Sequence, residues 1–371
     1  MKIIHVVLGK ANPERMNGVN KVAYQLARTQ HGLGHDASVW GIANSLEHNY
    51  PPRPFKTRLF LQSPRKYRLG ADLPAALREV PAGTVFHLHG AFIPEFFLLS
   101  KQMRKRGLPY VYTPHGSLTK AAMQQSKWRK KIYFNLFEKP LIRHARAVQL
   151  LGDQEYSFLD RLVKIEHKVL IPNGMDLSEL PKDLDHQPNP VPVFNFCGRL
   201  DAYHKGLDLM LEGFALFLKN GRQARLELIG DGKDRAALEQ QAKDLGIEKS
   251  VVFYGAKYGD EKYRLMARGD VFLHTSRMEG FPMAVLEAAA LNRPCLTSEP
   301  TNINRFIRQY EAGIPLNEHH NPSTICQGME KAFYFFKNNQ LTQLGNNAGK
   351  MVSQAFNWKN ISRQLVRVYA G

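Results

Sequence analysis

The 371-residue chain lacks the features that mark membrane-spanning, secreted and disulfide-stabilised proteins. No stretch approaches about eighteen consecutive apolar residues, the length that a helix needs to cross a bilayer. The opening residues MKIIHVVLGK turn polar too soon for a signal peptide. Three cysteines, Cys197, Cys295 and Cys326, stand far apart without a CxxC pair, which argues against a disulfide framework and a zinc knuckle. We therefore expect a cytoplasmic protein.

Acidic residues are scarce, and the first half of the chain is poorest in them. The formal net charge is +18. Residues 1–185 contain 28 Lys and Arg against 15 Asp and Glu, whereas residues 186–371 contain 23 against 18. Within residues 101–146, twelve basic residues accompany a single acid, Glu138. Such a segment favours an anionic partner, which means nucleic acid, acidic lipid or a phosphorylated substrate.

Internal repeats and low-complexity tracts are also missing, and the remaining composition is that of an ordinary globular protein. The chain is longer than a single core usually covers, so we expect two domains. Short apolar runs ending in glycine or a polar residue alternate with segments long enough for helices. The expected strands are residues 2–9, 36–42, 84–90, 108–116, 147–152, 168–174, 193–200, 224–232, 250–256, 270–276 and 293–299.

This alternation predicts an α/β protein with two consecutive, doubly wound parallel sheets. A polar, proline-rich stretch at residues 178–192 interrupts the pattern, and we interpret it as the linker. The expected domains are therefore residues 1–177 and 193–355. Ligands are expected at the carboxyl ends of the strands, in a cleft between the domains.

One candidate site is SRMEGFPMAVLEAAALNRP, residues 276–294, which sets two acids eight positions apart. Pro282 suits the first position of a helix, so Glu279 precedes the helix and Glu287 falls in its second turn. The amides of Met283 and Ala284 would then lack helical partners and attract a phosphate. The alternative is a buried helix with one solvated acid and one capping acid.

Two cations form a second candidate site. Arg199 follows an expected strand and Lys205 precedes an expected helix, so both could neutralise a diphosphate. The alternative is a pair of solvated loop cations. In the first half, Asn17 and Gly18 close the loop after the first strand, where a glycine lets the backbone approach a phosphate.

Two histidines end strands in the first half. His89 in HLHG and His115 in TPHGSL are each followed by glycine, as if the chain turned sharply under a ligand. For His89 a purely structural, hydrogen-bonded role is an equal alternative.

Taken together, these segments resemble the family 4 glycosyltransferases of the bacterial polysaccharide-biosynthesis type. The resemblance covers essentially the whole chain, and its order and spacing are specific. It is carried by the segments NGVNKVAYQLARTQHGLGHDASVW, TPHGSL, VLIPNGMDLSEL, CGRL with HKGLDLML, LELIGDG, VVFYGA and, above all, EGFPMAVLEAAALNRP, which has the form of the family's EX7E motif.

The resemblance implies a GT-B fold, in which two Rossmann-like domains face a central cleft. It further implies a retaining, metal-independent transfer from a nucleotide-diphosphate sugar, with no cofactor and with the leaving phosphate taking the acceptor's proton. The C-terminal helix, residues 356–371, would cross back onto the first domain. The acceptor would be a glycan or lipid-linked molecule.

Site roles also follow from the resemblance. Arg199 and Lys205 would hold the donor diphosphate, and the loop at Gly18 would approach it. Glu279 would contact the donor sugar beside His115, and Glu287 would bind the ribose. The remaining donor-binding residues would be Gly280, Phe281, Pro282, Met283 and Ala284.

The chain departs from the family pattern in places. The first of two usual loop glycines is replaced by Asn17, and Glu311 is the sole counterpart of an acid that the family carries after the EX7E helix, so it receives no role. The one DxD sequence, Asp183 to Asp185, falls in the linker and is interpreted as coincidence. Two rival functions are a nucleotide-sugar epimerase of the same fold and a basic nucleic-acid-binding protein, although no RNA-binding or zinc-finger motif is present.

Residues 126–146 suggest a peripheral contact with an anionic membrane on the cytoplasmic side. Trp128, Ile132, Phe134 and Phe137 alternate with basic residues, as in interfacial helices. The alternative is that Ile132, Leu136 and Pro140, which recur every four residues, pack this helix onto its own domain and leave the lysines solvated.

Overall fold

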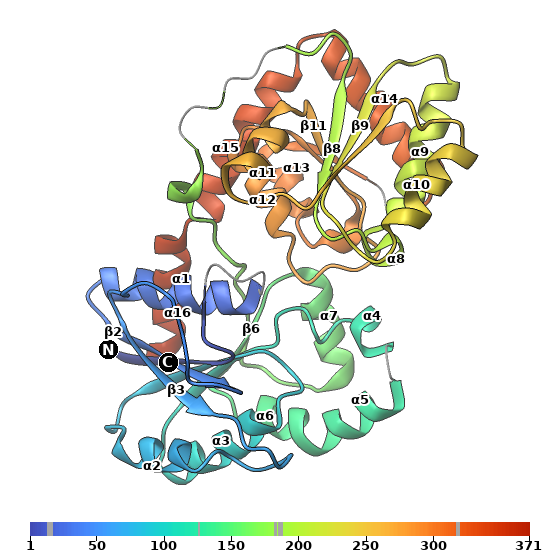
Figure 1. Ribbon diagram of the computed structural model, residues 1–371. Coiled ribbons are helices and arrows are strands. Elements are labelled where there is room, and N and C mark those ends of the chain that lie inside the picture. The colour runs from blue at the N-terminus through green and yellow to red at the C-terminus, as the bar shows by residue number, and fades with distance from the viewer. Residues whose placement is uncertain (13–17, 125–126, 182–183, 185–187, 317–319) are drawn as a thin grey trace. The chain divides into compact units, whose positions relative to one another are not determined.

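Alternating strands and helices build two parallel sheets in a computed structural model that describes residues 1–12, 18–124, 127–181, 184, 188–316 and 320–371. The chain divides into two units (Figure 1). The first comprises Met1–Gly174 and Trp358–Gly371, and the second comprises Met175–Asn357. The predicted linker and the DxD sequence lie partly outside the described residues.

The first unit contains a seven-stranded sheet in the order β3-β2-β1-β4-β5-β6-β7, with every pair parallel. The strands are β1 (Lys2–Leu8), β2 (Asp36–Ala43), β3 (Lys56–Leu61), β4 (Val85–His89), β5 (Tyr110–Thr113), β6 (Ala147–Leu150) and β7 (Lys168–Leu170). The helices are α1 (Gly18–Gly32), α2 (Asp72–Glu79), α3 (Pro94–Lys105), α4 (Lys120–Gln124), α5 (Lys127–Tyr133), η1 (Phe134–Glu138), α6 (Lys139–Arg143), α7 (Asp153–Leu162) and α16 (Trp358–Ala370).

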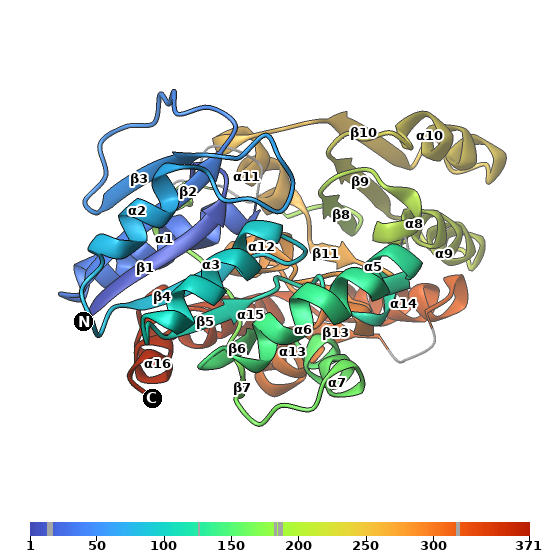
Figure 2. The same ribbon diagram turned by 90° about the horizontal axis from the view of Figure 1, so that it is seen from below.

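Both faces of this sheet are covered, which is why its inner strands β4, β5 and β6 are buried at every position. Successive side chains of β1 point to opposite faces. Ile4 joins a core with α2, α3, α6 and α7, whereas Ile3 joins a core with α1 and α16. Seen from below in Figure 2, α2, α3 and α6 lie over the strands of the first sheet.

The C-terminal helix α16 belongs to the first unit, as the family resemblance implied. Ile361 and Leu365 are fully buried in the core shared with α1, and Val368 packs partly against it. Gly174 marks the point where the chain leaves this unit, and a Cβ added there would lie 2.5 Å from the ring of Trp358. A glycine is therefore required where the outgoing and returning segments meet.

The second unit contains a six-stranded parallel sheet in the order β10-β9-β8-β11-β12-β13. The strands are β8 (Val193–Cys197), β9 (Arg225–Ile229), β10 (Val251–Gly255), β11 (Val271–His274), β12 (Cys295–Thr297) and β13 (Gly313–Pro315). The helices are η2 (Leu177–Glu179), α8 (Ala202–Lys205), α9 (Leu207–Lys219), α10 (Arg235–Asp244), α11 (Gly259–Arg268), α12 (Met283–Ala290), η3 (Glu299–Thr301), α13 (Asn304–Tyr310), α14 (Pro322–Lys337) and α15 (Leu341–Ala355).

The eleven predicted strands all occur, and the structure adds β3 and β13. β3 is an edge strand in which Lys56 and Arg58 interrupt the apolar residues, and β13 has only three residues, so neither has a clear apolar signal. Among the described helices, none combines the length and the apolar character needed to span a bilayer.

The helices that follow residue 126 differ in part from both predictions for them, the interfacial helix and the helix packed on its own domain. Trp128, Ile132 and Leu136 are 75%, 60% and 59% exposed, so the packing of Ile132 and Leu136 on their own domain is wrong. Phe134, predicted for the membrane face, is instead buried, and Phe137 packs against Phe97. The exposed apolar side chains recur every four residues, which places them on one side of α5 and η1.

Candidate functional site

The loops that follow β8 and β11 lie where ligands usually bind to a sheet of this kind. Strand order reverses between β8 and β11, and ligands of open α/β sheets bind at such a switch point, outside the carboxyl ends of the strands. Arg199 and Lys205 follow β8, and Glu279 follows β11. The topology therefore gathers the predicted cations and one predicted acid at the same edge.

Lys205 is placed by the short helix α8 and the turn after it. Asp201 caps this helix by accepting a hydrogen bond from the amide of His204 at 3.1 Å. Gly206 then adopts a φ of +65°, and an added Cβ would lie 2.1 Å from the carbonyl oxygen of Thr275. The chain consequently turns directly over the end of β11, and Lys205 faces the loop that carries Glu279.

Glu279 is held through one of its two carboxylate oxygens. Its Oε2 pairs with Lys205 Nζ and accepts a hydrogen bond from His274 Nε2 at 3.0 Å. Burial opposes ionisation, but the His274 hydrogen bond and the charge of Lys205 outweigh it and lower the Glu279 pKa to about 2. Its Oε1 has no hydrogen bond to any described residue, so an ionised oxygen remains available.

Glu287 repeats this arrangement on helix α12. Its Oε1 accepts a hydrogen bond from Lys262 at 2.8 Å and a longer one from the Tyr263 hydroxyl at 3.5 Å. Both side chains of the ion pair are less than one fifth exposed. Within the described chain no group bonds Oε2, so this carboxylate also keeps one oxygen available. The alternative of one solvated acid and one capping acid is therefore wrong.

The start of α12 differs from the prediction in two respects. Pro282 occupies the N-cap position, one residue before the helix, because its ψ of 81° is not helical. The amide of Met283 bonds the carbonyl of Phe281 at 3.1 Å and is not free, whereas no described backbone acceptor is assigned to the Ala284 amide. Phe281 itself is buried against Phe356.

Arg199 lies where the sequence places it but makes little contact with the protein. Its side chain is 68% exposed and its Nη2 lies 3.7 Å from Asp201 Oδ2. An exposed pair of this kind contributes little to stability. The solvated-cation alternative thus describes Arg199 and fails for Lys205, which is 18% exposed.

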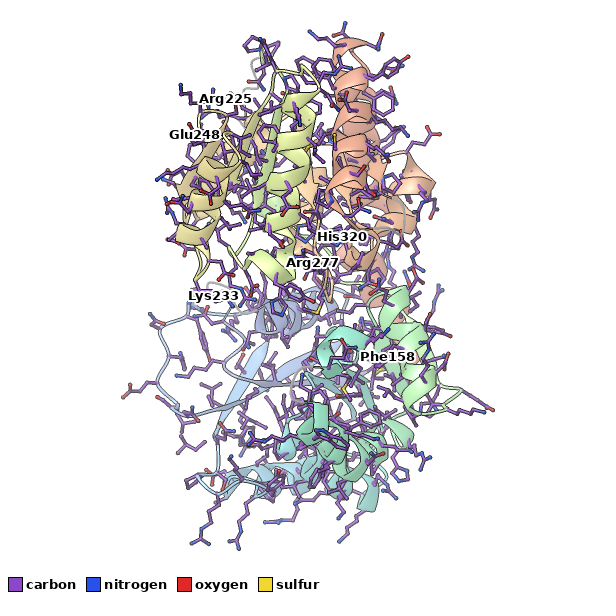
Figure 3. The ribbon with its side chains drawn as sticks, turned by 90° about the vertical axis from the view of Figure 1, so that its right-hand side faces the viewer. Phe158, Arg225, Lys233, Glu248, Arg277 and His320 are labelled. Carbon is purple, nitrogen blue, oxygen red and sulfur yellow. The ribbon has the colours of Figure 1, made fainter. Side chains whose placement is uncertain are left out.

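Sequence reasoning missed several residues that hold the site. Asn302 has a φ of +63° and donates to the carbonyls of Glu279 and Gly280 at 2.9 and 3.3 Å. Arg277 binds both oxygens of Asp208 at 2.6 and 2.7 Å, which ties the Glu279 loop to α9. Figure 3 shows Arg277 close to His320. The sequence could have pointed to His274, because His274 is the last residue of its strand β11, as His89 is the last residue of β4.

The first unit presents Gly18 and His115 at the carboxyl ends of its strands. Gly18 is the exposed first residue of α1, and an added Cβ would meet nothing within 4 Å. Packing of the described residues therefore does not explain a glycine at this position. Asn17 lies outside the described residues.

His115 follows β5 with a φ of +52°, an uncommon conformation for a residue with a side chain. Its Nε2 lies 3.1 Å from Nδ1 of His89, and burial lowers the His115 pKa to about 3. His89 is itself buried between His115 and His5, so the structural role weighed for His89 is the one observed.

Comparison with known proteins agrees with this geometry. The family described as Glycosyltransferase Family 4 matches residues 16–179, and the family described as Glycosyl transferases group 1 matches residues 182–351. The chain belongs to these glycosyltransferase families. An uncharacterized glycosyltransferase of Methanocaldococcus jannaschii is 30% identical over 47% of this chain and 43% of its own length. A GDP-mannose:cellobiosyl-diphosphopolyprenol alpha-mannosyltransferase of Komagataeibacter xylinus is 24% identical over 100% of this chain and 93% of its own.

Solved structures of this glycosyltransferase fold cover the whole chain. Sucrose-phosphate synthase from Thermosynechococcus elongatus has a TM-score of 0.80 at 18% identity, covering 100% of this chain and 98% of its own. Anabaena HepE in complex with UDP and glucose has a TM-score of 0.73 at 17% identity, covering 100% and 99%. These likenesses establish the GT-B fold. The chain spans 43% to 59% of the length of the first three curated relatives.

Proposed function

We propose that this family member transfers a sugar from a nucleotide-diphosphate sugar to a hydroxyl group of a glycan or lipid-linked acceptor in surface polysaccharide biosynthesis. The observation that carries the proposal is the pair of carboxylates Glu279 and Glu287. Each is neutralised by a lysine through one oxygen and leaves the other open. A sugar has hydroxyl groups to donate to such oxygens, whereas a purely structural ion pair has no need of an open one.

The donor diphosphate would lie against Lys205, Arg199 and the Ala284 amide. In the reaction the bond between the sugar's anomeric carbon and the diphosphate oxygen breaks, and a bond to the acceptor oxygen forms on the same face. The acceptor's proton passes to the leaving phosphate. The protein's part is to stabilise charge developing on that phosphate, which preorganised cations do effectively.

Glu287 would accept hydrogen bonds from the ribose, and Glu279 from the donor sugar, with His115 beside that sugar. The stretch from Gly280 to Met283 would line the same site. Because Lys205 and Arg199 can balance the diphosphate charge, we propose that the enzyme needs no metal ion and no further cofactor. An epimerase would use the same donor but would not consume an acceptor.

Protection from thermal unfolding by UDP-, GDP-, ADP- and dTDP-sugars would identify the donor, because a ligand that binds the folded state raises the melting temperature. With that donor, release of nucleotide should require an acceptor and should persist in EDTA. Release without an acceptor would contradict transfer, and loss of activity in EDTA that added metal restores would contradict metal independence. Salt-dependent oligonucleotide binding without a response to nucleotide sugars would favour the nucleic-acid alternative.

Gly18 offers a separate test of the phosphate-approach proposal. Gly18→Ala should leave the melting temperature unchanged or slightly raised, because alanine suits a helix better and the space beside Gly18 is open. The KM for the donor should rise several-fold, because a methyl group would obstruct the approaching phosphate. Steady-state kinetics and thermal unfolding measure both effects. An unchanged KM would remove Gly18 from the donor site.

We further propose that the protein acts at the cytoplasmic membrane surface and uses the basic segment, residues 101–146, to contact anionic lipid. The exposed stripe Trp128, Ile132 and Leu136 provides apolar insertion. Exposed Arg129 and Lys131 flank it, and each basic residue near an acidic bilayer contributes about 1 kcal/mol.

Changing Trp128, Ile132 and Leu136 together to serine should reduce sedimentation with anionic vesicles at least tenfold. Each apolar side chain contributes about 1.5–3 kcal/mol when fully buried, so partial insertion of three suffices for that loss. Tyr334→Ser is the matched control, because Tyr334 is 60% exposed in the second unit. Binding should also weaken with salt and after Arg129, Lys130 and Lys131 are changed to serine. If the unaltered protein fails to sediment at low salt, a soluble anionic saccharide becomes the better acceptor.

A further inference from the structure

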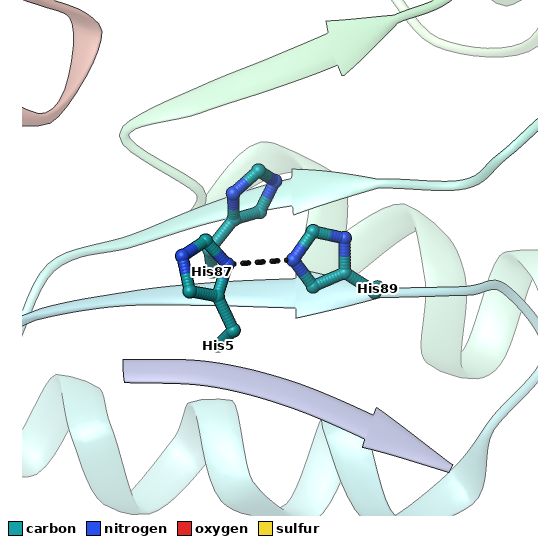
Figure 4. A group of neighbouring side chains, drawn as sticks. All are labelled: His5, His87 and His89. Atoms are coloured by element: carbon teal, nitrogen blue, oxygen red, sulfur yellow. Dashed lines mark hydrogen bonds between the residues drawn. The ribbon is translucent and has the colours of Figure 1, made fainter. Parts of the chain in front are cut away.

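A buried chain of polar side chains runs through the first unit behind His115. It comprises His115, His89, His5, Gln30, Tyr369, His87, Thr113 and Gln149, and ends on the carbonyl of Ile171. Apart from His115, these side chains are at most 2% exposed. Figure 4 shows the three buried histidines with the bond between His5 and His89. Burying so many polar groups is costly unless each one is satisfied.

The direction of every hydrogen bond follows from the backbone end of this chain. A carbonyl oxygen only accepts, so the Gln149 group that lies 2.8 Å from the Ile171 oxygen must be its amide nitrogen. The Gln149 oxygen therefore accepts from the Thr113 hydroxyl at 2.9 Å. Thr113 has no second proton, so its oxygen accepts from Nε2–H of His87 at 2.6 Å.

Burial lowers the pKa of His87, His5 and His89, so each ring is neutral and has one donor and one acceptor nitrogen. Nδ1 of His87 thus accepts from the Tyr369 hydroxyl at 2.6 Å. The Tyr369 oxygen in turn faces the Gln30 amide nitrogen at 3.4 Å, which turns the Gln30 oxygen toward His5.

The remaining steps lead to His115. The Gln30 oxygen accepts from Nε2–H of His5 at 2.8 Å, so Nδ1 of His5 accepts from Nε2–H of His89 at 2.9 Å. Nδ1 of His89 must then accept from Nε2–H of His115 at 3.1 Å. His115 is left with its proton on Nε2 and a lone pair on Nδ1, for which no partner is assigned among the described residues.

We propose that His89 and the buried chain behind it are positioning residues that hold His115 as the Nε2–H tautomer, so that its Nδ1 accepts a hydrogen bond from a hydroxyl group of the donor sugar. The contact with the sugar rests on the function proposed above, whereas the tautomer does not. The series of hydrogen-bonded side chains also gives the returning helix α16 a role in the site, because Tyr369 of α16 belongs to it.

A metal ion is the other ligand that three histidines suggest, since His5, His87 and His89 bring their ring nitrogens within 4.8 Å of one another. Both nitrogens of His87 are already bonded, to Tyr369 and Thr113. Both nitrogens of His5 are likewise bonded, to His89 and Gln30. A metal would have to replace at least two of these bonds, so we favour the hydrogen-bonded chain.

The tautomer of His115 can be measured without any ligand. In the full-length protein with nitrogen-15-labelled histidine at neutral pH, NMR should show His115 with a protonated Nε2 and an unprotonated Nδ1. The His115→Gln variant assigns the signals by their loss. Observation of the Nδ1–H tautomer, or of two equally populated tautomers, would overturn the proposal.

Substitutions in the series of hydrogen-bonded side chains distinguish an effect on the position of His115 from an effect on the stability of the protein. Tyr369→Phe removes the link between Gln30 and His87 and should give a mixture of His115 tautomers, with kcat/KM for the donor from the thermal screen lowered about tenfold. Tyr110→Phe is the matched control, because the buried Tyr110 hydroxyl bonds the carbonyl of Leu141 at 2.6 Å and lies outside the chain. It should lower the melting temperature similarly and leave the His115 spectrum unchanged.

A second pair covers the case in which Tyr369→Phe does not fold. His89→Leu removes the acceptor for His115, whereas His89→Asn retains an oxygen near the position of Nδ1, so only the asparagine variant should keep the single tautomer and most of the activity. A single Nε2–H tautomer in His89→Leu would overturn the proposal. If the tautomers follow expectation but no nucleotide sugar binds, the proposed function fails while the positioning of His115 stands.

Discussion

Replacing Lys205 with alanine should lower turnover about a hundredfold or more while the protein remains folded. Losing one preorganised partner of a developing anion costs about 10²–10³ in kcat, and Lys205 is the less exposed of the two cations proposed to hold the diphosphate. Glu279 keeps its hydrogen bond from His274 in the variant, so its carboxylate is not left without a partner. We therefore expect the melting temperature to fall by only a few degrees.

Arg222→Ala provides the control for losing an ion pair in the same unit. Arg222 binds Glu330 at 2.9 Å, and no part of the proposed site involves it. This variant should match the wild-type enzyme in kcat. Turnover of Lys205→Ala within a few-fold of the wild-type value would refute the assignment, whatever its melting temperature. A large fall in melting temperature with normal turnover would make Lys205 a structural partner of Glu279.

Strands and their order along the chain are predictable here because both sheets are parallel and covered on both faces. Each buried strand is then an apolar run that ends in a turn residue, as in β1 and β8. An edge strand such as β3 lacks this signal, because the exposed Lys56 and Arg58 interrupt its apolar residues. The return of α16 to the first unit could not be derived from periodicity, which shows that a helix has a buried face but not which core covers it.

The candidate site, like the fold, could be predicted from the sequence only in part. Glu279 and Glu287 were predictable from one motif because they lie eight positions apart, and Lys205 was predictable from the separate short segment that also contains Arg199. Their partners were not: His274 and Lys262 reach the acids from β11 and α11, and contacts between elements leave no local pattern. The exposed stripe on α5 and η1 shows the limit of composition, since Phe134 is as apolar as Trp128 but points into the core.

The buried histidines illustrate a further limit. A histidine at the end of a strand looks alike in sequence whether it meets a ligand or supports another histidine, yet in the structure His89 is buried within β4 and His115 is less buried and follows β5 with a positive φ. The structure connects His5 directly to His89, and it connects His87 to them through Gln30 and Tyr369, which come from α1 and α16.

Glu287→Gln should raise the KM for the donor about ten- to a hundredfold and change kcat much less. Hydrogen bonds to a charged group contribute about 1.5–3 kcal/mol, and a tenfold change in affinity corresponds to about 1.4 kcal/mol. A ribose contact is made equally in the ground and transition states, so its loss appears in KM. Glutamine keeps a carbonyl oxygen for Lys262 and a similar volume, which limits the loss of stability.

Glu330→Gln is the matched control, because Glu330 is also an ion-paired carboxylate of the second unit and is held by Arg222. Its KM should be that of the wild-type enzyme. The contrast between the two variants tests whether the open Oε2 of Glu287 matters, since both variants lose a charge but only Glu287→Gln loses an oxygen that is proposed to bind the ribose. If Glu287→Gln lowers the melting temperature and leaves the KM unchanged, the carboxylate serves Lys262 alone, and the ribose must be bound elsewhere.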